Sequence, residues 1–73
     1  MRKTDLERLL DPVALDGWFN SLSEVLEKKY KTSSGEEKTK YIIRGIDGKI
    51  MQEVYSAEAL NNYFREVAQD ETI

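Results

Sequence analysis

The chain has 73 residues, of which 40% are hydrophobic, and its 11 basic and 14 acidic side chains give a formal net charge of −3. This length allows one small domain, and the hydrophobic content is too high for a disordered chain. The sequence contains no Cys and no His, which excludes thiol and imidazole catalysis, disulfide bonds, and zinc sites built from those side chains.

Two N-terminal helices are predicted, over about residues 4–11 and 12–31. Thr4 is the expected N-cap of the first helix, as part of a capping box. Asp11 and Pro12 end it and suit the start of the second, because Asp caps helices and Pro fits their first position. Asp16-Gly17 is a second possible start. Apolar residues then recur at helical spacing and predict a long amphipathic helix. They are Leu15, Trp18, Phe19, Leu22, Val25, Leu26 and Tyr30.

A loop and a β-hairpin are predicted next. Residues 32–38 include no apolar side chain and are expected to form a mobile loop. Two β-prone runs then flank Asp47-Gly48, which predicts a hairpin over about residues 39–55 with a two-residue turn. In that register one face carries Tyr41, Ile43, Ile50 and Val54. The other carries Ile42, Ile46, Met51 and Tyr55 among charged side chains, and a G1-bulge register would reshuffle the two sets.

The last predicted element is a helix over about residues 57–69, capped by Ser56 and followed by a frayed tail at 70–73. The expected fold is therefore a small single α+β domain in the order αα-ββ-α. Its core is expected to be formed by Leu22, Leu26, Ile43, Val54, Leu60, Phe64 and Val67.

Both faces of the predicted hairpin carry apolar residues, and a two-stranded sheet is not stable in water without cover. The helices could cover both faces within a monomer. Alternatively, they could all pack on one face and leave the other for a second chain, since exposed apolar patches mark interfaces. Pairing at the open strand edges is a third route to association.

The sequence shows no catalytic constellation. The serines lack a histidine to act as base, and Glu36-Glu37 lies in the predicted loop, where solvation explains it. Neither a phosphate-binding glycine loop nor an EF-hand is present. We therefore expect a protein that is not an enzyme and that uses no cofactor or metal ion.

By elimination, the predicted function is stoichiometric binding to another protein, as a small regulatory or inhibitory accessory protein, with a homodimer left open. Small acidic chains of this kind are common among phage- and plasmid-encoded regulators. The predicted partner-binding surface is the outer hairpin face, because Tyr, Arg and Met are enriched at interfaces. Its residues are Ile42, Arg44, Ile46, Met51 and Tyr55.

The alternative prediction is a nucleic-acid-binding accessory protein. Residues 28–49 carry a net charge of +4, whereas the segments on both sides are acidic. Phosphates would then contact Lys28, Lys29, Lys31, Lys38, Lys40, Arg44 and Lys49.

The N-terminal residues are charged and lack the apolar stretch of a signal peptide. The longest apolar runs fall far short of the roughly 20 residues of a membrane-spanning helix. We therefore expect a soluble, intracellular protein located in the cytoplasm, with no membrane partner.

Overall fold

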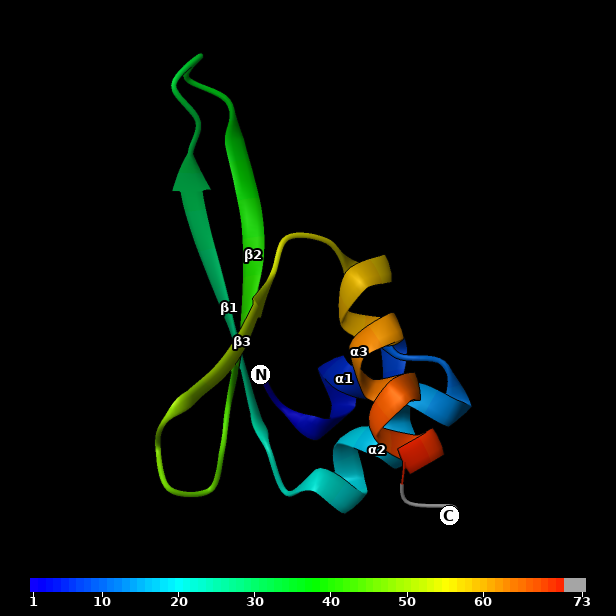
Figure 1. The fold of residues 1–73 in the computed structure, drawn as a ribbon. Coiled ribbons are helices and arrows are strands. Elements are labelled where there is room, and N and C mark those ends of the chain that lie inside the picture. The colour runs from blue at the N-terminus through cyan, green and yellow to red at the C-terminus, as the bar shows by residue number, and fades with distance from the viewer. Residues whose placement is uncertain (71–73) are drawn as a thin grey trace.

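The computed structural model describes residues 1–70 and has the element order ααβββα (Figure 1). Its elements are α1 (Lys3–Leu9), α2 (Pro12–Ser21), β1 (Glu24–Lys31), β2 (Glu37–Arg44), β3 (Ile50–Val54) and α3 (Ala57–Asp70). The predicted α+β class is confirmed, but the antiparallel sheet has three strands in the order β1-β2-β3 and not two. The tail predicted to be frayed spans residues 70–73. Asp70 is the last residue of α3, and the other three lie outside the described residues.

The predicted long helix over residues 12–31 is wrong beyond Ser21. Leu22 adopts a left-handed conformation (φ 55°, ψ 29°) that ends α2, and β1 begins at Glu24. β1 then pairs with β2 along its whole length, from Glu24 opposite Arg44 to Lys31 opposite Glu37. The Glu, Leu and Lys residues of β1 favour a helix locally, but tertiary pairing routinely overrides such weak preferences.

The predicted mobile loop at residues 32–38 is a tight hairpin turn followed by the start of β2. Gly35 N–H donates to the carbonyl of Thr32, and Thr32 N–H donates to the carbonyl of Glu36, both at 2.9 Å. Gly35 has a φ of +88°, which only glycine adopts without strain. This is a three-residue hairpin loop with a glycine in the left-handed position.

The β2–β3 turn has the same geometry, with Gly48 at φ +84° and its N–H donating to the carbonyl of Gly45. The loop is thus one residue longer than the predicted two-residue turn. A β-bulge next to Arg44 compensates, so the register beyond it is the predicted one. The pairs are Tyr41 with Val54, Ile42 with Glu53 and Ile43 with Gln52. Ile50 moves to a place opposite Arg44 on the other face, and Ile46 becomes part of the loop.

All three helices lie on one side of the sheet (Figure 1), which defines an inner face toward them and an outer face away from them. The core between the layers consists of Leu6, Leu10, Ala14, Val25, Ile43, Val54, Leu60 and Phe64. Four of the seven predicted core residues are in this set. Leu22 was predicted wrongly, being 68% exposed, while Leu26 and Val67 are half-buried outside the buried cluster.

The ends of the helices are fixed by polar side chains. Asp11 caps α2 by accepting from Ala14 N–H at 2.8 Å, and Ser56 caps α3 by accepting from Ala59 N–H at 3.1 Å, both as predicted. The predicted Thr4 cap is wrong, because α1 begins one residue earlier without a side-chain cap.

Asn61 on α3 holds the connection between α1 and α2. Its side-chain oxygen accepts from Asp11 N–H at 2.8 Å, and its amide donates to the carbonyls of Leu9 at 3.0 Å and Ala57 at 2.9 Å. Arg65, one turn further along α3, forms an ion pair with the Asp11 carboxylate. One side of α3 therefore fixes the entry into α2.

The far end of the β1–β2 hairpin projects beyond the helices, which gives the molecule an elongated shape of 44 × 25 × 22 Å (Figure 1). Both faces of the sheet are uncovered by helices at that end. Within residues 1–70, every helix is too short or too polar to cross a bilayer.

Candidate binding site

Three of the predicted partner-binding residues are well exposed: Ile46 at 85%, Met51 at 56% and Tyr55 at 58%. The other two are engaged within the sheet. Ile42 is only 9% exposed, and Arg44 donates to Glu24 on β1 at 2.7 Å. The structure thus leaves three of the five predicted residues well exposed to a partner.

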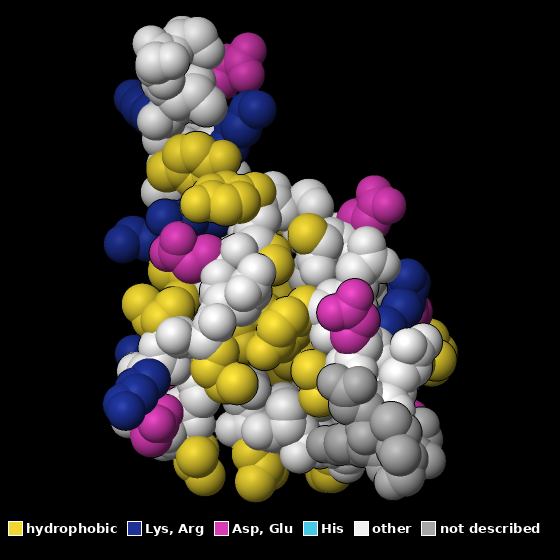
Figure 2. Space-filling view, in the orientation of Figure 1, with side chains coloured by type: hydrophobic (Ala, Val, Ile, Leu, Met, Phe, Trp, Pro, Cys, Tyr) yellow, Lys and Arg dark blue, Asp and Glu magenta, His cyan; other side chains and the backbone are white. Residues whose placement is uncertain are grey.

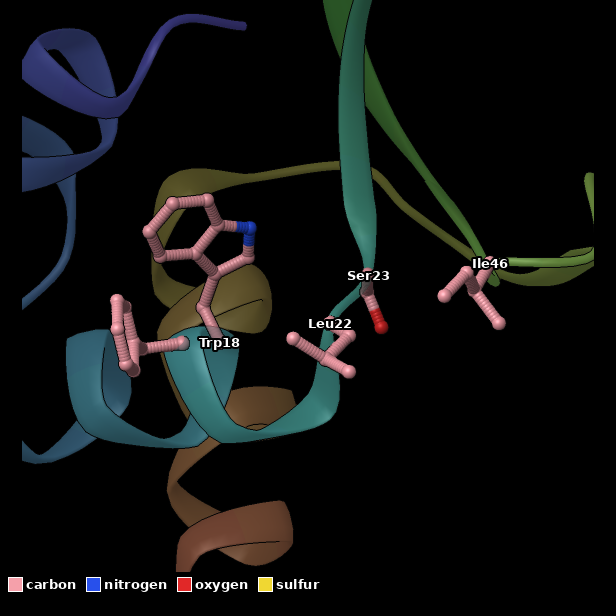
Figure 3. Close-up of a pocket in the computed structure, with 5 residues that line it drawn as sticks. Trp18, Leu22, Ser23 and Ile46 are labelled. Atoms are coloured by element: carbon pink, nitrogen blue, oxygen red, sulfur yellow. The ribbon is translucent and has the colours of Figure 1, made fainter.

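Ile46 lies in the β2–β3 loop, where it lines an open pocket of about 360 Å³ (Figure 3). The rest of the pocket comes from the end of α2 and the connection to β1, with Leu22 between Trp18 and Ile46 in this view. Its lining residues are Trp18, Phe19, Leu22, Ser23 and Ile46. Two chain segments that are distant in sequence therefore build one apolar concavity.

The apolar side chains around this pocket are largely exposed. Phe19 is 61% and Leu22 is 68% exposed, and both lie next to Trp18, whose ring contacts the Phe19 ring edge-on at 6.5 Å between centroids. Grouped exposed apolar side chains mark interaction sites, whereas isolated ones are ordinary. We call Trp18, Phe19, Leu22 and Ile46 the apolar pocket.

Leu22 owes its position to an unfavourable backbone conformation. A left-handed conformation is rare for a residue with a bulky side chain, and it costs roughly 1–2 kcal/mol, whereas glycine adopts it freely. Here that conformation directs the chain from α2 into β1 and leaves a leucine side chain exposed at the pocket. Strained residues of this kind cluster at functional sites.

Trp18 carries a polar group on its ring, the indole Nε1–H, beside the Ser23 hydroxyl that also lines the pocket. Its indole Nε1–H is buried and has no hydrogen-bond partner within the described residues. Figure 3 shows the five-membered ring, with its nitrogen, on the side of the indole nearer Ser23. A buried donor without an acceptor is destabilising by about 1–3 kcal/mol, so a ligand that displaces the side chains covering it and supplies an acceptor would recover that free energy.

The predicted nucleic-acid-binding residues are divided between the two faces of the sheet. Side chains alternate along a strand, so Lys28 and its register partner Lys40 lie on the outer face together with Lys38 and Arg44. Lys29 and Lys31 lie on the opposite face, where Lys29 forms an exposed ion pair with Glu37 at 3.8 Å. Lys49 follows the β2–β3 turn.

Among the described residues, two carboxylates have lowered pKa values, and both form ion pairs within the fold. The guanidinium of Arg65, hydrogen-bonded to Asp11, holds the Asp11 pKa below its ordinary value, and the Ala14 N–H adds to this effect. Arg44 lowers the pKa of Glu24 in the same way. Burial is the main cause of the raised pKa of Tyr41, on the inner face. None of these groups lines the apolar pocket.

Sequence reasoning placed Phe19 and Leu22 on a buried helical stripe and so missed the pocket. Two serines flanking Leu22 were the available signal, because Ser competes with the helix backbone for hydrogen bonds. In the structure the Ser21 hydroxyl donates to the Trp18 carbonyl at 2.8 Å and accepts from Ser23 N–H at 3.3 Å, across the end of α2.

No three acidic side chains within the described part of the chain are grouped closely enough to hold a metal ion. Comparison of the chain with protein-family models, with curated proteins and with solved structures gives no match. Inference about function therefore rests on the chemistry of the exposed surfaces.

Proposed function

We propose that this chain is a non-enzymatic accessory protein that binds one other protein stoichiometrically and so regulates or inhibits it. The observation that supports the proposal is the apolar pocket, which exposed Phe19, Leu22 and Ile46 line together with Trp18. A pocket lined in this way fits an apolar side chain presented by a partner.

The partner is expected to insert one large apolar side chain next to a main-chain carbonyl. Burying a Leu, Met or Phe side chain contributes about 1.5–3 kcal/mol. The carbonyl would accept a hydrogen bond from the buried Trp18 Nε1–H, which has no acceptor among the described residues. An apolar anchor next to one directed hydrogen bond is a common arrangement at the centre of protein interfaces.

This proposal shifts the predicted partner surface toward the helices. It retains Ile46 and replaces the outer sheet face with residues at the end of α2. Ile42 and Arg44, which are covered or ion-paired, then serve the sheet itself.

Selection from a displayed library of random peptides on the immobilised protein tests the proposal. We expect enriched peptides to share one large apolar residue and to shift the fluorescence of Trp18, the only tryptophan in the chain. The variants Leu22→Gly and Ile46→Ser should each weaken binding about tenfold, as expected for loss of one apolar contact.

Val13→Ser is the matched control, because Val13 is 51% exposed on the same helix but does not line the pocket. It should bind the selected peptides as the wild type does. Selection that enriches no peptide, or peptides that bind Leu22→Gly and wild type equally, would overturn the proposal.

A further inference from the structure

A second surface, at the other end of the molecule, combines aromatic and basic side chains. The register places Tyr30 opposite Lys38 and Lys28 opposite Lys40, all on the outer face of the projecting hairpin. Tyr55, just after β3, packs against Tyr30 with 6.1 Å between ring centroids and an interplanar angle of 80°. We call Lys28, Tyr30, Lys38, Lys40 and Tyr55 the basic hairpin face.

Three lysines therefore surround one aromatic ring. Lys28 precedes Tyr30 by two residues on the same strand, Lys38 is its register partner, and the Lys40 Nζ lies 5.9 Å from the ring centroid. Figure 2 shows hydrophobic side chains next to Lys and Arg side chains on the projecting part of the molecule. Tyr30 is half-buried and Tyr55 is 58% exposed, so both residues are accessible to solvent.

The positive charges on this face are incompletely neutralised. Lys28 and Lys40 lie directly opposite each other, an arrangement of like charges that destabilises a sheet. Lys40 has a carboxylate partner in Glu53 at 3.6 Å, whereas Lys28 and Lys38 have no ion-pair partner among the described side chains. An anion bound across the strands would relieve this repulsion.

We propose that the basic hairpin face binds single-stranded nucleic acid, with phosphates at the lysines and a base against Tyr30 and Tyr55. Alternating phosphates and planar rings match the alternation of lysine and tyrosine, and base–aromatic stacking is the general means of holding single strands. A duplex keeps its bases stacked inside and offers the tyrosines nothing to stack on. An acidic peptide matches the lysines but not the rings.

This inference does not depend on the proposed function, because the basic hairpin face and the apolar pocket share no residue. It also narrows the broader prediction for residues 28–49. Lys29 and Lys31 are left out, since they lie on the opposite face, and Tyr30 and Tyr55 are added.

Fluorescence anisotropy of a labelled oligothymidylate, titrated with the full chain from about 50 mM salt upward, tests the proposal. Each phosphate contact to a single strand contributes about −0.7 to the slope of log affinity against log salt, so three lysines give about −2. Lys28→Gln with Lys38→Gln should reduce that slope to about −0.7. Tyr30→Leu should weaken binding about tenfold and leave the slope unchanged.

The matched control is Lys29→Gln with Lys31→Gln, which removes the same charge from the same hairpin on the opposite face. It should keep the wild-type slope, and Leu22→Gly should bind the oligonucleotide as the wild type does. Equal effects of the two lysine pairs would overturn the proposal. So would absence of binding at low salt, or equally tight binding of a duplex or of polyglutamate.

Discussion

Comparing Leu22→Gly with Leu22→Ala separates the effect of the backbone conformation on stability from the effect of the lost side chain at the end of α2. Both variants remove the leucine side chain, which is already 68% exposed, so the lost burial is small and common to both. They differ because alanine keeps a Cβ in a left-handed conformation (φ 55°) and glycine does not.

Relief of the left-handed strain stabilises the Gly variant by roughly 1–2 kcal/mol relative to Ala. The greater freedom of glycine in the unfolded chain offsets about 0.4–1 kcal/mol of that gain. The net difference is about 1 kcal/mol in favour of Gly, consistent with the preference for glycine just after helices. We therefore expect the Gly variant to be close to wild type in stability and the Ala variant to be less stable.

Thermal unfolding followed by circular dichroism measures this difference. For a domain of this size, 1 kcal/mol corresponds to a shift in Tm of about 4–8 °C. An Ala variant that melts at or above the temperature of the Gly variant would refute the reasoning, because it would mean that Leu22 is not held in a left-handed conformation in solution.

Four further predictions concern the packing and charge of the fold. A Cβ on Gly17 would overlap the carbonyl of Phe64 on α3, so Gly17→Ala should destabilise the protein by about 1–3 kcal/mol in urea unfolding, despite the better helix propensity of alanine. Asn61→Ala removes two hydrogen bonds to the α1–α2 connection and one to Ala57 within α3, and it should lower the free energy of unfolding by about 2 kcal/mol, measured in the same way. Because Arg65 lowers the pKa of Asp11 below 3.8 in the folded state, the stabilisation it gives is present above that pH and is lost as the pH falls through the folded pKa. Asp11→Asn should therefore be less stable than wild type at about pH 6 and should approach it in strongly acidic solution, and a constant difference across a pH series of urea titrations would contradict this. Light scattering should give a mass near 8.5 kDa at low and high concentration, since Ile42 is already covered on the outer sheet face, and a doubled mass would show self-association.

The sequence predicted those parts of the fold in which local pattern and tertiary environment agree. α3 follows its apolar spacing, and Leu60 and Phe64 are fully buried. β1 was missed because its own residues are mostly helix formers with a single β-branched residue, Val25. It is a strand because it pairs with β2. The spacing of apolar residues within β1 alone gives no information about that pairing.

A local signal for β1 was nevertheless present in the turn that follows it. Gly35 and Gly48 occupy the same left-handed position in two hairpin loops of the same length. The second was recognised because it followed Asp between two β-prone runs, whereas the first was overlooked because a lysine-rich segment preceded it. A glycine at the third position of a three-residue loop is evidence for a hairpin even when one flanking strand has helical composition.

The candidate surfaces were harder to predict than the fold, because each joins residues that only the sheet and the α2–β1 connection bring together. Ile46 meets Leu22 across the pocket, and Tyr30 meets Tyr55 across the sheet. Neither surface contributes a residue to the buried cluster that holds the layers together. Variants of their exposed residues, such as Leu22 and Ile46, should therefore leave the protein folded, and a loss of binding in them can be assigned to the contact that was removed; Trp18 is different, because it packs against that cluster. The same cannot be said of Gly17 or Asn61, where any loss of binding would be inseparable from a loss of stability.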